Sequence, residues 1–139
     1  MHIKKVKEHS ASYCELVVTD NLKDVICVCD PFPFNNGIIP SNGMEVIMLN
    51  AFFLDETPSI TLINDIKKQD YKLTKASIFG MSYATKGKVV DEKKYIVKVY
   101  DFYIGLEYLF SPEYDGFQKF PYKEGEWIEF VADRFDAVI

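Results

Sequence analysis

The chain has 139 residues, a net charge of −5 and an apolar content of 48%, which together predict one globular domain over residues 1–139. A chain of this length can fold without a metal or a disulfide framework, and its three cysteines are an odd number. The acidic balance disfavours anionic membranes and phosphate backbones at long range. No apolar run approaches the roughly 18 residues of a membrane helix and no cationic leader is seen, so we expect a cytoplasmic protein.

The first elements are predicted to be a hairpin that follows a polar start. Residues 1–12 are weakly patterned and are expected to form an edge strand or a loose arm. Residues 13–19 and 25–29 are rich in β-branched and apolar residues, and the polar stretch "DNLKD" separates them. This pattern indicates two antiparallel strands joined by a turn.

A proline- and glycine-rich loop follows at 30–43. Three prolines and two glycines in "DPFPFNNGIIPSNG" are incompatible with a continuous helix and with a central strand. The loop nevertheless carries Phe32, Phe34, Ile38 and Ile39. Two interpretations stay open: the loop packs over the core, where burial of this apolar area is favourable, or it presents a contact surface.

Residues 44–54 form a nearly continuous apolar run, which predicts a strand buried on both faces. The next element, a short helix at 58–68, is predicted from its ends. Thr57 is an acceptable N-cap, Pro58 suits the first helical position, and lysines occupy the last turn. Because isoleucine and threonine are poor helix formers, a short strand at 59–63 is the alternative.

The second half reads as strands interrupted by glycine. Residues 71–90 are expected to be one long strand, or two with a bend, since Gly80 and Gly87 interrupt the pattern. The charged stretch "DEKK" at 91–94 links them to an alternating strand at 95–105, so we predict a hairpin. An aromatic-rich connection at 106–125 leads into a last strand from about 126.

That last strand, "GEWIEFVADRFDAVI", changes the parity of its apolar residues around Asp133 and Arg134, which suggests a bulge or bend. We therefore expect the strand to show one face to the core before this point and the other face after it. Ile128 and Phe130 are predicted to be buried, Glu129 and Arg134 exposed, and Trp127 partly covered by the connection before it.

Together these elements predict an all-β fold: a small curved antiparallel β-barrel with one short helix at 58–68. Mid-strand glycines and strands that are apolar on both faces are typical of closed sheets. A helix between the third and fourth strands is also the position of the helix in the OB-fold. A two-sheet β-sandwich is the alternative.

The stretches "YATKGKVVD", "YIVKVYDFYIGLE" and "GEWIEFVADRFDAVI" together resemble the strand pattern of small, OB-like bacterial β-barrel proteins. The resemblance covers residues 83–139. It contains no catalytic motif, so it implies architecture and says little about activity.

No catalytic or cofactor motif is present: the nucleotide-binding glycine patterns, the zinc-protease helix motif and the nucleophile elbow are all missing. Cys27 and Cys29 lie about 6.6 Å apart on a strand, unlike the usual zinc spacing on a turn, so buried thiols are expected. Glu129, Asp133 and Asp101 lie within strands and are predicted to belong to solvated faces. We expect no catalytic residue, no metal and no cofactor.

These observations favour a non-enzymatic binding module that acts on a protein partner, possible examples being an antitoxin or immunity-type protein. Single-stranded nucleic-acid binding of the OB type is the alternative, with strand aromatics as stacking platforms and nearby lysines as phosphate contacts. Net charge disfavours it. The candidate binding surface consists of Phe32, Phe34, Tyr83, Lys88, Tyr95, Lys98 and Tyr100.

Overall fold

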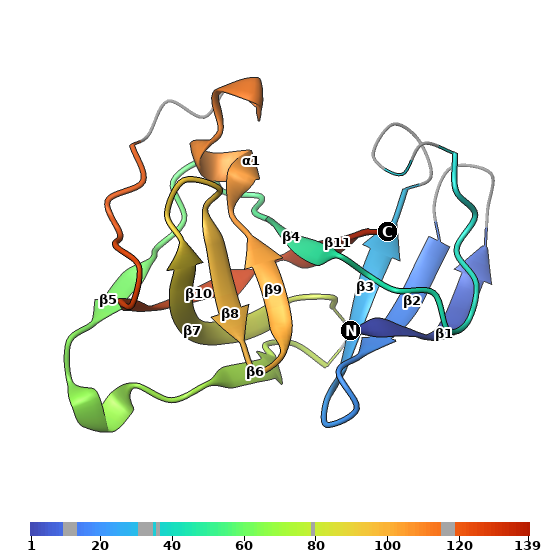
Figure 1. Cartoon of the computed structure of the whole chain (residues 1–139), viewed down its shortest axis with the longest axis horizontal. Helices are drawn as coiled ribbons and strands as arrows, with labels where there is room; N and C mark the ends of the chain where they lie inside the picture. The colour runs from blue at the N-terminus through green and yellow to red at the C-terminus, as the bar shows by residue number, and fades with distance from the viewer. Residues whose placement is uncertain (10–13, 31–34, 36, 79, 115–118) are drawn as a thin grey trace.

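The computed structural model describes residues 1–9, 14–30, 35, 37–78, 80–114 and 119–139. Within them the fold is all-β, as predicted, and the strands form one 11-stranded sheet (Figure 1). The strands are β1 (His2–His9), β2 (Cys14–Thr19), β3 (Asp24–Cys29), β4 (Met48–Phe52), β5 (Thr61–Ile63), β6 (Lys72–Lys75), β7 (Tyr83–Asp91), β8 (Ile96–Val99), β9 (Phe102–Gly105), β10 (Trp127–Ala132) and β11 (Arg134–Val138). The helical segments are η1 (Ile66–Lys68), α1 (Glu107–Phe110) and η2 (Pro112–Tyr114).

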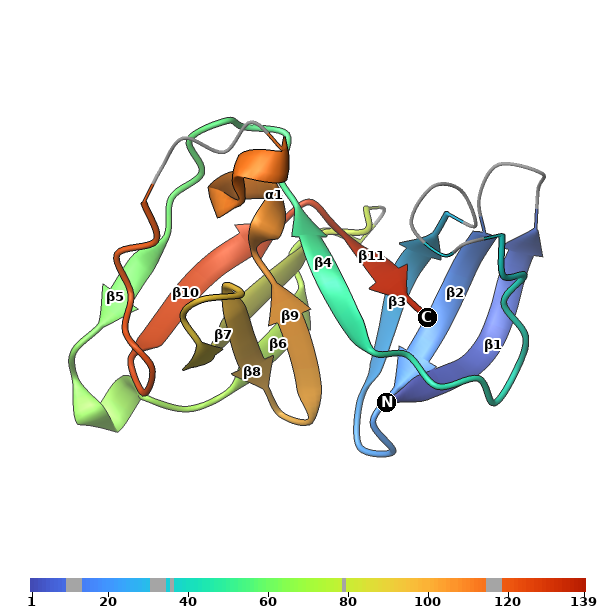
Figure 2. The same ribbon diagram turned by 45° about the horizontal axis from the view of Figure 1, so that its top comes forward.

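The sheet has two halves joined by two strands. The order along the sheet is β1-β2-β3-β11-β4-β9-β8-β7-β10-β5, and β6 pairs with β7. In Figure 2, β1, β2 and β3 lie side by side in one half, α1 lies with β7 to β10 in the other, and β4 and β11 run between them. The sheet is mixed and not purely antiparallel, because β11 pairs with β3, and β4 with β9, in parallel.

The expected closure into a barrel is not seen, since the hydrogen-bonded path ends at β1 and at β5. At both ends of the sheet, the edge strand has a feature that limits pairing with another chain. The outer edge of β1 is covered by the chain at 43–46: Ile3 N–H donates to Met44 O at 2.8 Å, and Gly43 N–H donates to Ile3 O at 2.7 Å. At the other end, β5 is only three residues long.

The segment 58–68 does not form the predicted α-helix. It contains strand β5 followed by the 3₁₀ turn η1, which Asp65 caps by accepting from Lys67 N–H. The alternative of a short strand is correct for this stretch. Ile63 pairs with Trp127 of β10, so tertiary pairing reinforces the β preference of the isoleucines and threonine. The α-helix lies instead in the aromatic-rich connection, as α1.

Residues 95–105 form two strands and not one. After β8 the chain turns at Tyr100 and Asp101, and β9 returns antiparallel beside it, with Lys98 opposite Tyr103. Tyr100 has a φ of 53°, which is unusual for a non-glycine residue. The other predicted hairpins, β2–β3 and β7–β8, are confirmed.

The predicted parity change in the last strand is confirmed. Ile128 and Phe130 are buried before the bend, and Phe135 and Ala137 are buried after it. Asp133, between β10 and β11, holds the bend: its N–H donates to Phe52 O at 2.9 Å, and its carboxylate accepts from Leu54 N–H at 2.7 Å. As a result β10 pairs with β7 while β11 pairs with β4.

Three details of that strand differ from the prediction. Glu129 and Arg134 are half-exposed and not fully exposed. The Arg134 guanidinium lies 4.2 Å from the Phe52 ring centroid and donates to Asp136 at 2.7 Å. These two contacts keep the Arg134 side chain against the sheet and reduce its exposure to solvent. Trp127 is half-buried, but its ring contacts Tyr71 at 5.0 Å.

One buried amide secures the start of the loop that follows β3. Asn35 is 1% exposed, and its Nδ2 donates to Asp30 O at 2.8 Å and to Ala137 O at 3.2 Å, while its Oδ1 accepts from Ile139 N–H at 2.8 Å.

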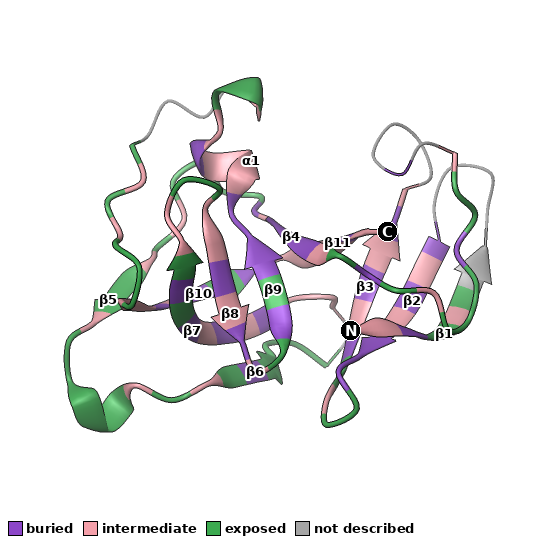
Figure 3. Ribbon diagram, in the orientation of Figure 1, coloured by how far each residue is buried: buried purple, intermediate pink, exposed green. Residues whose placement is uncertain are grey.

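Of the apolar residues in this loop, Ile38 and Ile39 are exposed, whereas Phe32 and Phe34 lie outside the described residues. Figure 3 shows the core as buried bands that alternate with accessible ones along the strands.

Candidate functional site

Two of the predicted surface residues, Lys88 and Lys98, lie directly opposite each other. They are a register pair of β7 and β8. Lys88 also pairs across with Trp127 of β10, and Lys98 pairs across with Tyr103 of β9. Directly opposed residues project from the same face of a sheet. Trp127, Lys88, Lys98 and Tyr103 therefore form one line across four strands, which we call the lysine–aromatic row.

The row lies on the accessible face of the sheet. Its neighbours along each strand, Ile128, Val89, Val97 and Phe102, are all buried on the opposite face, and Tyr103 is 44% exposed. With about 4.8 Å between strands, the row spans about 14 Å. It has two amines at its centre and an aromatic ring at each end.

The two amines of the row have few partners. Among the described residues Lys88 takes part in no ion pair, and Lys98 reaches only Asp101, at 4.0 Å. Like charges directly opposite one another destabilise a sheet. The opposed lysines thus depart from favourable pairing, and such departures are expected at functional or strained sites.

Further aromatic rings adjoin the Trp127 end of the row. Tyr71 lies 5.0 Å from Trp127 and 5.3 Å from Tyr100 by ring centroids, and the Tyr100 hydroxyl donates to Tyr71 O at 3.2 Å. The Lys23 amine lies 4.7 Å from the centroid of Tyr100. Tyr100, a predicted surface residue, is thus next to the row and is held in place by its neighbours.

Acidic side chains border the same face. Lys86 of β7 is bonded to Asp70 at 2.9 Å and lies 3.9 Å from Glu129. The charge of Lys86 is therefore locally balanced, unlike that of Lys88.

The prediction that Tyr83 belongs to the surface is wrong. Tyr83 is 4% exposed; its ring lies 5.6 Å from Phe135, and its hydroxyl accepts from Ile26 N–H at 2.9 Å. Its position on β7 has the parity of the buried residues Thr85 and Val89. The hydroxyl has a hydrogen-bond partner inside the protein, so burial does not leave it unsatisfied.

Tyr95 is separate from the row. It lies at the β7–β8 turn with a φ of 60°, and its ring contacts Phe120 at 5.4 Å and Phe110 at 6.1 Å. This packing fixes α1 and the following connection against the hairpin. Phe32 and Phe34 lie outside the described residues, so their part in the predicted surface stays a prediction.

The predicted surface did not include Tyr71, Trp127 or Tyr103, although Tyr103 is one of the strand aromatics considered as stacking platforms. The signal available was the period-two alternation of each strand, which places Lys88 and Trp127 opposite their buried neighbours. What the sequence lacks is the register between strands, because no local pattern says that Lys98 faces Tyr103.

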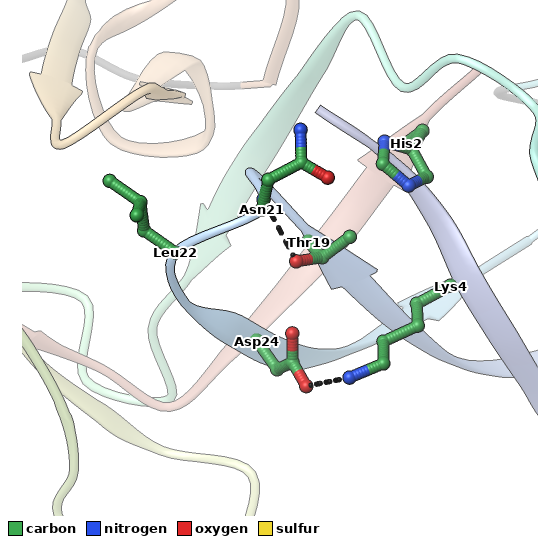
Figure 4. A pocket seen from close by; sticks show the side chains of 6 residues that line it. All are labelled: His2, Lys4, Thr19, Asn21, Leu22 and Asp24. Atoms are coloured by element: carbon green, nitrogen blue, oxygen red, sulfur yellow. Dashed lines mark hydrogen bonds and ion pairs between the residues drawn. The ribbon is translucent and has the colours of Figure 1, made fainter.

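A polar hollow lies at the β2–β3 turn. It has a volume of about 510 Å³ and is lined by side chains of β1, the end of β2 and that turn (Figure 4). Lys4 and Asp24 form an ion pair of 2.7 Å within it, and Asn21 N–H donates to Thr19 Oγ1 at 3.0 Å. Its charges are satisfied internally, so it is a weaker candidate than the row.

The cysteines are buried, as predicted. Cys14, Cys27 and Cys29 are all 0% exposed and free of disulfides. Within the described residues no group of three or more His, Cys, Asp or Glu side chains is arranged to hold a metal ion. No helix of the described segments has the length and apolar character to cross a bilayer.

Comparisons with known proteins return no matching family model, no similar curated protein and no similar solved structure.

Proposed function

We propose that this protein is a binding module that holds a single-stranded nucleic acid on the lysine–aromatic row. The observation that carries the proposal is the placement of Lys88 and Lys98 between Trp127 and Tyr103 on one accessible face. Single-strand binders combine cations that track the phosphates with aromatic rings on which bases stack. The row offers both within about 14 Å.

The energetics also favour an anionic ligand. A phosphate between the two amines relieves their mutual repulsion, and each base stacked on an aromatic ring contributes about 1–3 kcal/mol. The net charge of −5 and the nearby Asp101 and Glu129 oppose long-range attraction. We therefore expect the single strand to bind weakly, through short-range contacts with the row and not through long-range attraction.

The architecture gives secondary support. OB-type proteins bind single strands on the face of a small curved sheet, and the strand pattern of residues 83–139 resembles theirs. Function inferred from such a likeness is an analogy, so the row carries the proposal and the likeness adds to it.

Trp127 is the only tryptophan of the chain and reports on the row directly. We expect a short oligo-dT strand to quench its fluorescence at low salt. With two phosphate contacts, the logarithm of the affinity should fall with that of the salt concentration with a slope of about −1.4, at about −0.7 per contact. Unchanged fluorescence at tens of micromolar oligonucleotide contradicts the proposal.

Matched charge variants locate the site. The double variant Lys88→Ala/Lys98→Ala should lose the quenching. Lys5→Ala/Lys7→Ala removes the same charge from exposed positions of β1, in the other half of the sheet, and should keep it. Equal losses in both variants mean that only net charge matters, which contradicts binding at the row.

A protein partner is the second candidate. It is favoured by large apolar side chains that stay exposed, among them Ile39 at 61% and Ile47 at 62%. These positions lie away from the row, in the chain between β3 and β4. Binding of the dye bis-ANS should fall in Ile39→Asp and Ile47→Asp if they form an apolar patch, and dye binding that does not change argues against this function.

A further inference from the structure

A second hollow lies between the β7–β8 turn and α1. Its volume is about 300 Å³, the lower end of the range for small-molecule sites. Lys93 and Lys94 line it from the turn, while Glu107 and Glu113 line it from α1 and η2. We call it the turn–helix pocket.

The charged groups of the pocket do not neutralise one another. Among the described residues none of Lys93, Lys94, Glu107 and Glu113 takes part in an ion pair within 4.0 Å. The turn that carries the lysines is fixed, because Asp91 Oδ1 accepts from the backbone N–H groups of both at 3.0 Å. Two cations and two carboxylates thus line one small volume without closing on each other.

Glu107 is held by a buried amide. Asn50 is 2% exposed, and its Nδ2 donates to Glu107 Oε1 at 2.8 Å. A Cβ at Gly105 would lie 2.6 Å from Asn50 Oδ1, so the absence of a side chain at this position leaves room for the amide. One oxygen of Glu107, Oε1, is thereby fixed at the wall of the pocket.

The remaining lining is mostly apolar. Tyr95, Ile96 and Met48 line the pocket as well, and Ser111 adds one hydroxyl. The ring of Tyr95 is held by Phe120 and Phe110, and Leu106 N–H donates to Tyr95 O at 2.9 Å. The part of the wall formed by Tyr95 is therefore held in place before a ligand binds, which lowers the entropic cost of binding.

We propose that the turn–helix pocket binds a small zwitterion, a molecule that carries both an ammonium and a carboxylate, as a free amino acid with an apolar side chain does. The ammonium bonds to Glu107 and Glu113, the carboxylate bonds to Lys93 and Lys94, and the apolar group contacts Tyr95 and Ile96. This site is separate from the lysine–aromatic row and does not depend on nucleic-acid binding.

The test uses three probes with ¹⁵N-labelled protein: L-leucine, N-acetyl-L-leucine, which lacks the ammonium, and isopentylamine, which lacks the carboxylate. L-leucine at millimolar concentration should shift the amide resonances of Tyr95 and Ile96 in a saturable way. Each truncated probe should bind at least about tenfold more weakly, a difference of about 1.4 kcal/mol. Equal affinity for all three, or no saturable shift, overturns the proposal.

Separate variants test the carboxylates and the lysines of the turn–helix pocket. Glu107→Gln keeps an acceptor for Asn50 and should weaken L-leucine about tenfold or more, as should Lys93→Ala/Lys94→Ala at exposed positions. Glu124→Gln, an exposed change outside the pocket, should leave the affinity unchanged. If Glu107→Gln binds L-leucine as tightly as the unchanged chain, Glu107 does not hold the ammonium and the proposal fails.

Discussion

The backbone N–H of Ile26 in β3 donates a 2.9 Å hydrogen bond to the hydroxyl of Tyr83 in β7, 57 positions further along the chain. This bond ties together the two halves of the sheet. In Tyr83→Phe the ring stays, but the N–H of Ile26 loses its partner, so the free energy of unfolding should fall by about 1–3 kcal/mol. Urea unfolding measures it, with Tyr103→Phe, at an exposed ring, as the control. Equal stability of the two variants contradicts the role assigned to Tyr83.

Gly87 in β7 leaves no room for a side chain. A Cβ there would overlap Lys98 O and lie 2.6 Å from Val99 Cγ2, both in the neighbouring strand. Overpacking of this kind costs about 1–3 kcal/mol or more, so Gly87→Ala should be clearly destabilised in urea. Gly80→Ala meets nothing nearer than 3.5 Å and should unfold like the unchanged protein. A tolerated Gly87→Ala would mean that β7 and β8 lie further apart than described.

Asp20 makes stability depend on pH. Burial raises the pKa of its carboxyl, but hydrogen bonds from the N–H groups of Lys23, Leu22 and Asp101 outweigh this, and the pKa lies below its ordinary value. A carboxyl with a lower pKa in the folded state stabilises the fold above its unfolded-chain pKa, and this contribution is lost as pH falls through the folded-state pKa.

Asp20→Asn should therefore lower the free energy of unfolding most at neutral pH, and the gap should close in strongly acidic buffer. Urea unfolding across a pH series measures the gap, and Glu56→Gln, at an exposed position, is the control. If the difference in the free energy of unfolding stays constant with pH, the loss of stability in Asp20→Asn does not come from the charge of Asp20, which contradicts the prediction.

The thiols should be inert in the folded protein. Burial raises the pKa of Cys29 to about 12 and raises that of Cys27 as well, so the reactive thiolate is scarce at neutral pH. Iodoacetamide should label no native cysteine but should label all three in urea, as mass spectrometry would show. A cysteine introduced by Ser59→Cys, at an exposed position, should react in the native protein. Rapid native labelling of Cys27 or Cys29 would refute the burial.

Local patterns predicted the strands whose apolar residues alternate strictly. The β2–β3 hairpin and the parity change around Asp133 follow from period two alone, because a face that packs on the core must be apolar wherever it lies in the chain. The same pattern correctly placed Ile128 and Phe130 inside.

Other features depend on tertiary contacts that no local pattern contains. The turn at Tyr100 was missed because it has neither glycine nor asparagine, the residues that favour a positive φ. The strand at β5 was assigned to a helix because its end signals resemble caps, while its pairing with Trp127 is invisible in the sequence. The lysine–aromatic row was only partly foreseen, since Lys88 and Lys98 were named but their register was not.

The placement of β11 between β3 and β4 has a consequence for folding speed. Asn35 and Ile139, which secure this region, are 104 positions apart, and the parallel pairing of β11 with β3 spans a similar length of chain. The chain loses conformational entropy when such long loops close, before these contacts can stabilise it. β-Sheet proteins dominated by contacts between distant residues therefore fold in about milliseconds to seconds. Stopped-flow refolding followed through Trp127 should find a rate in that range, with the junction between the two halves forming late.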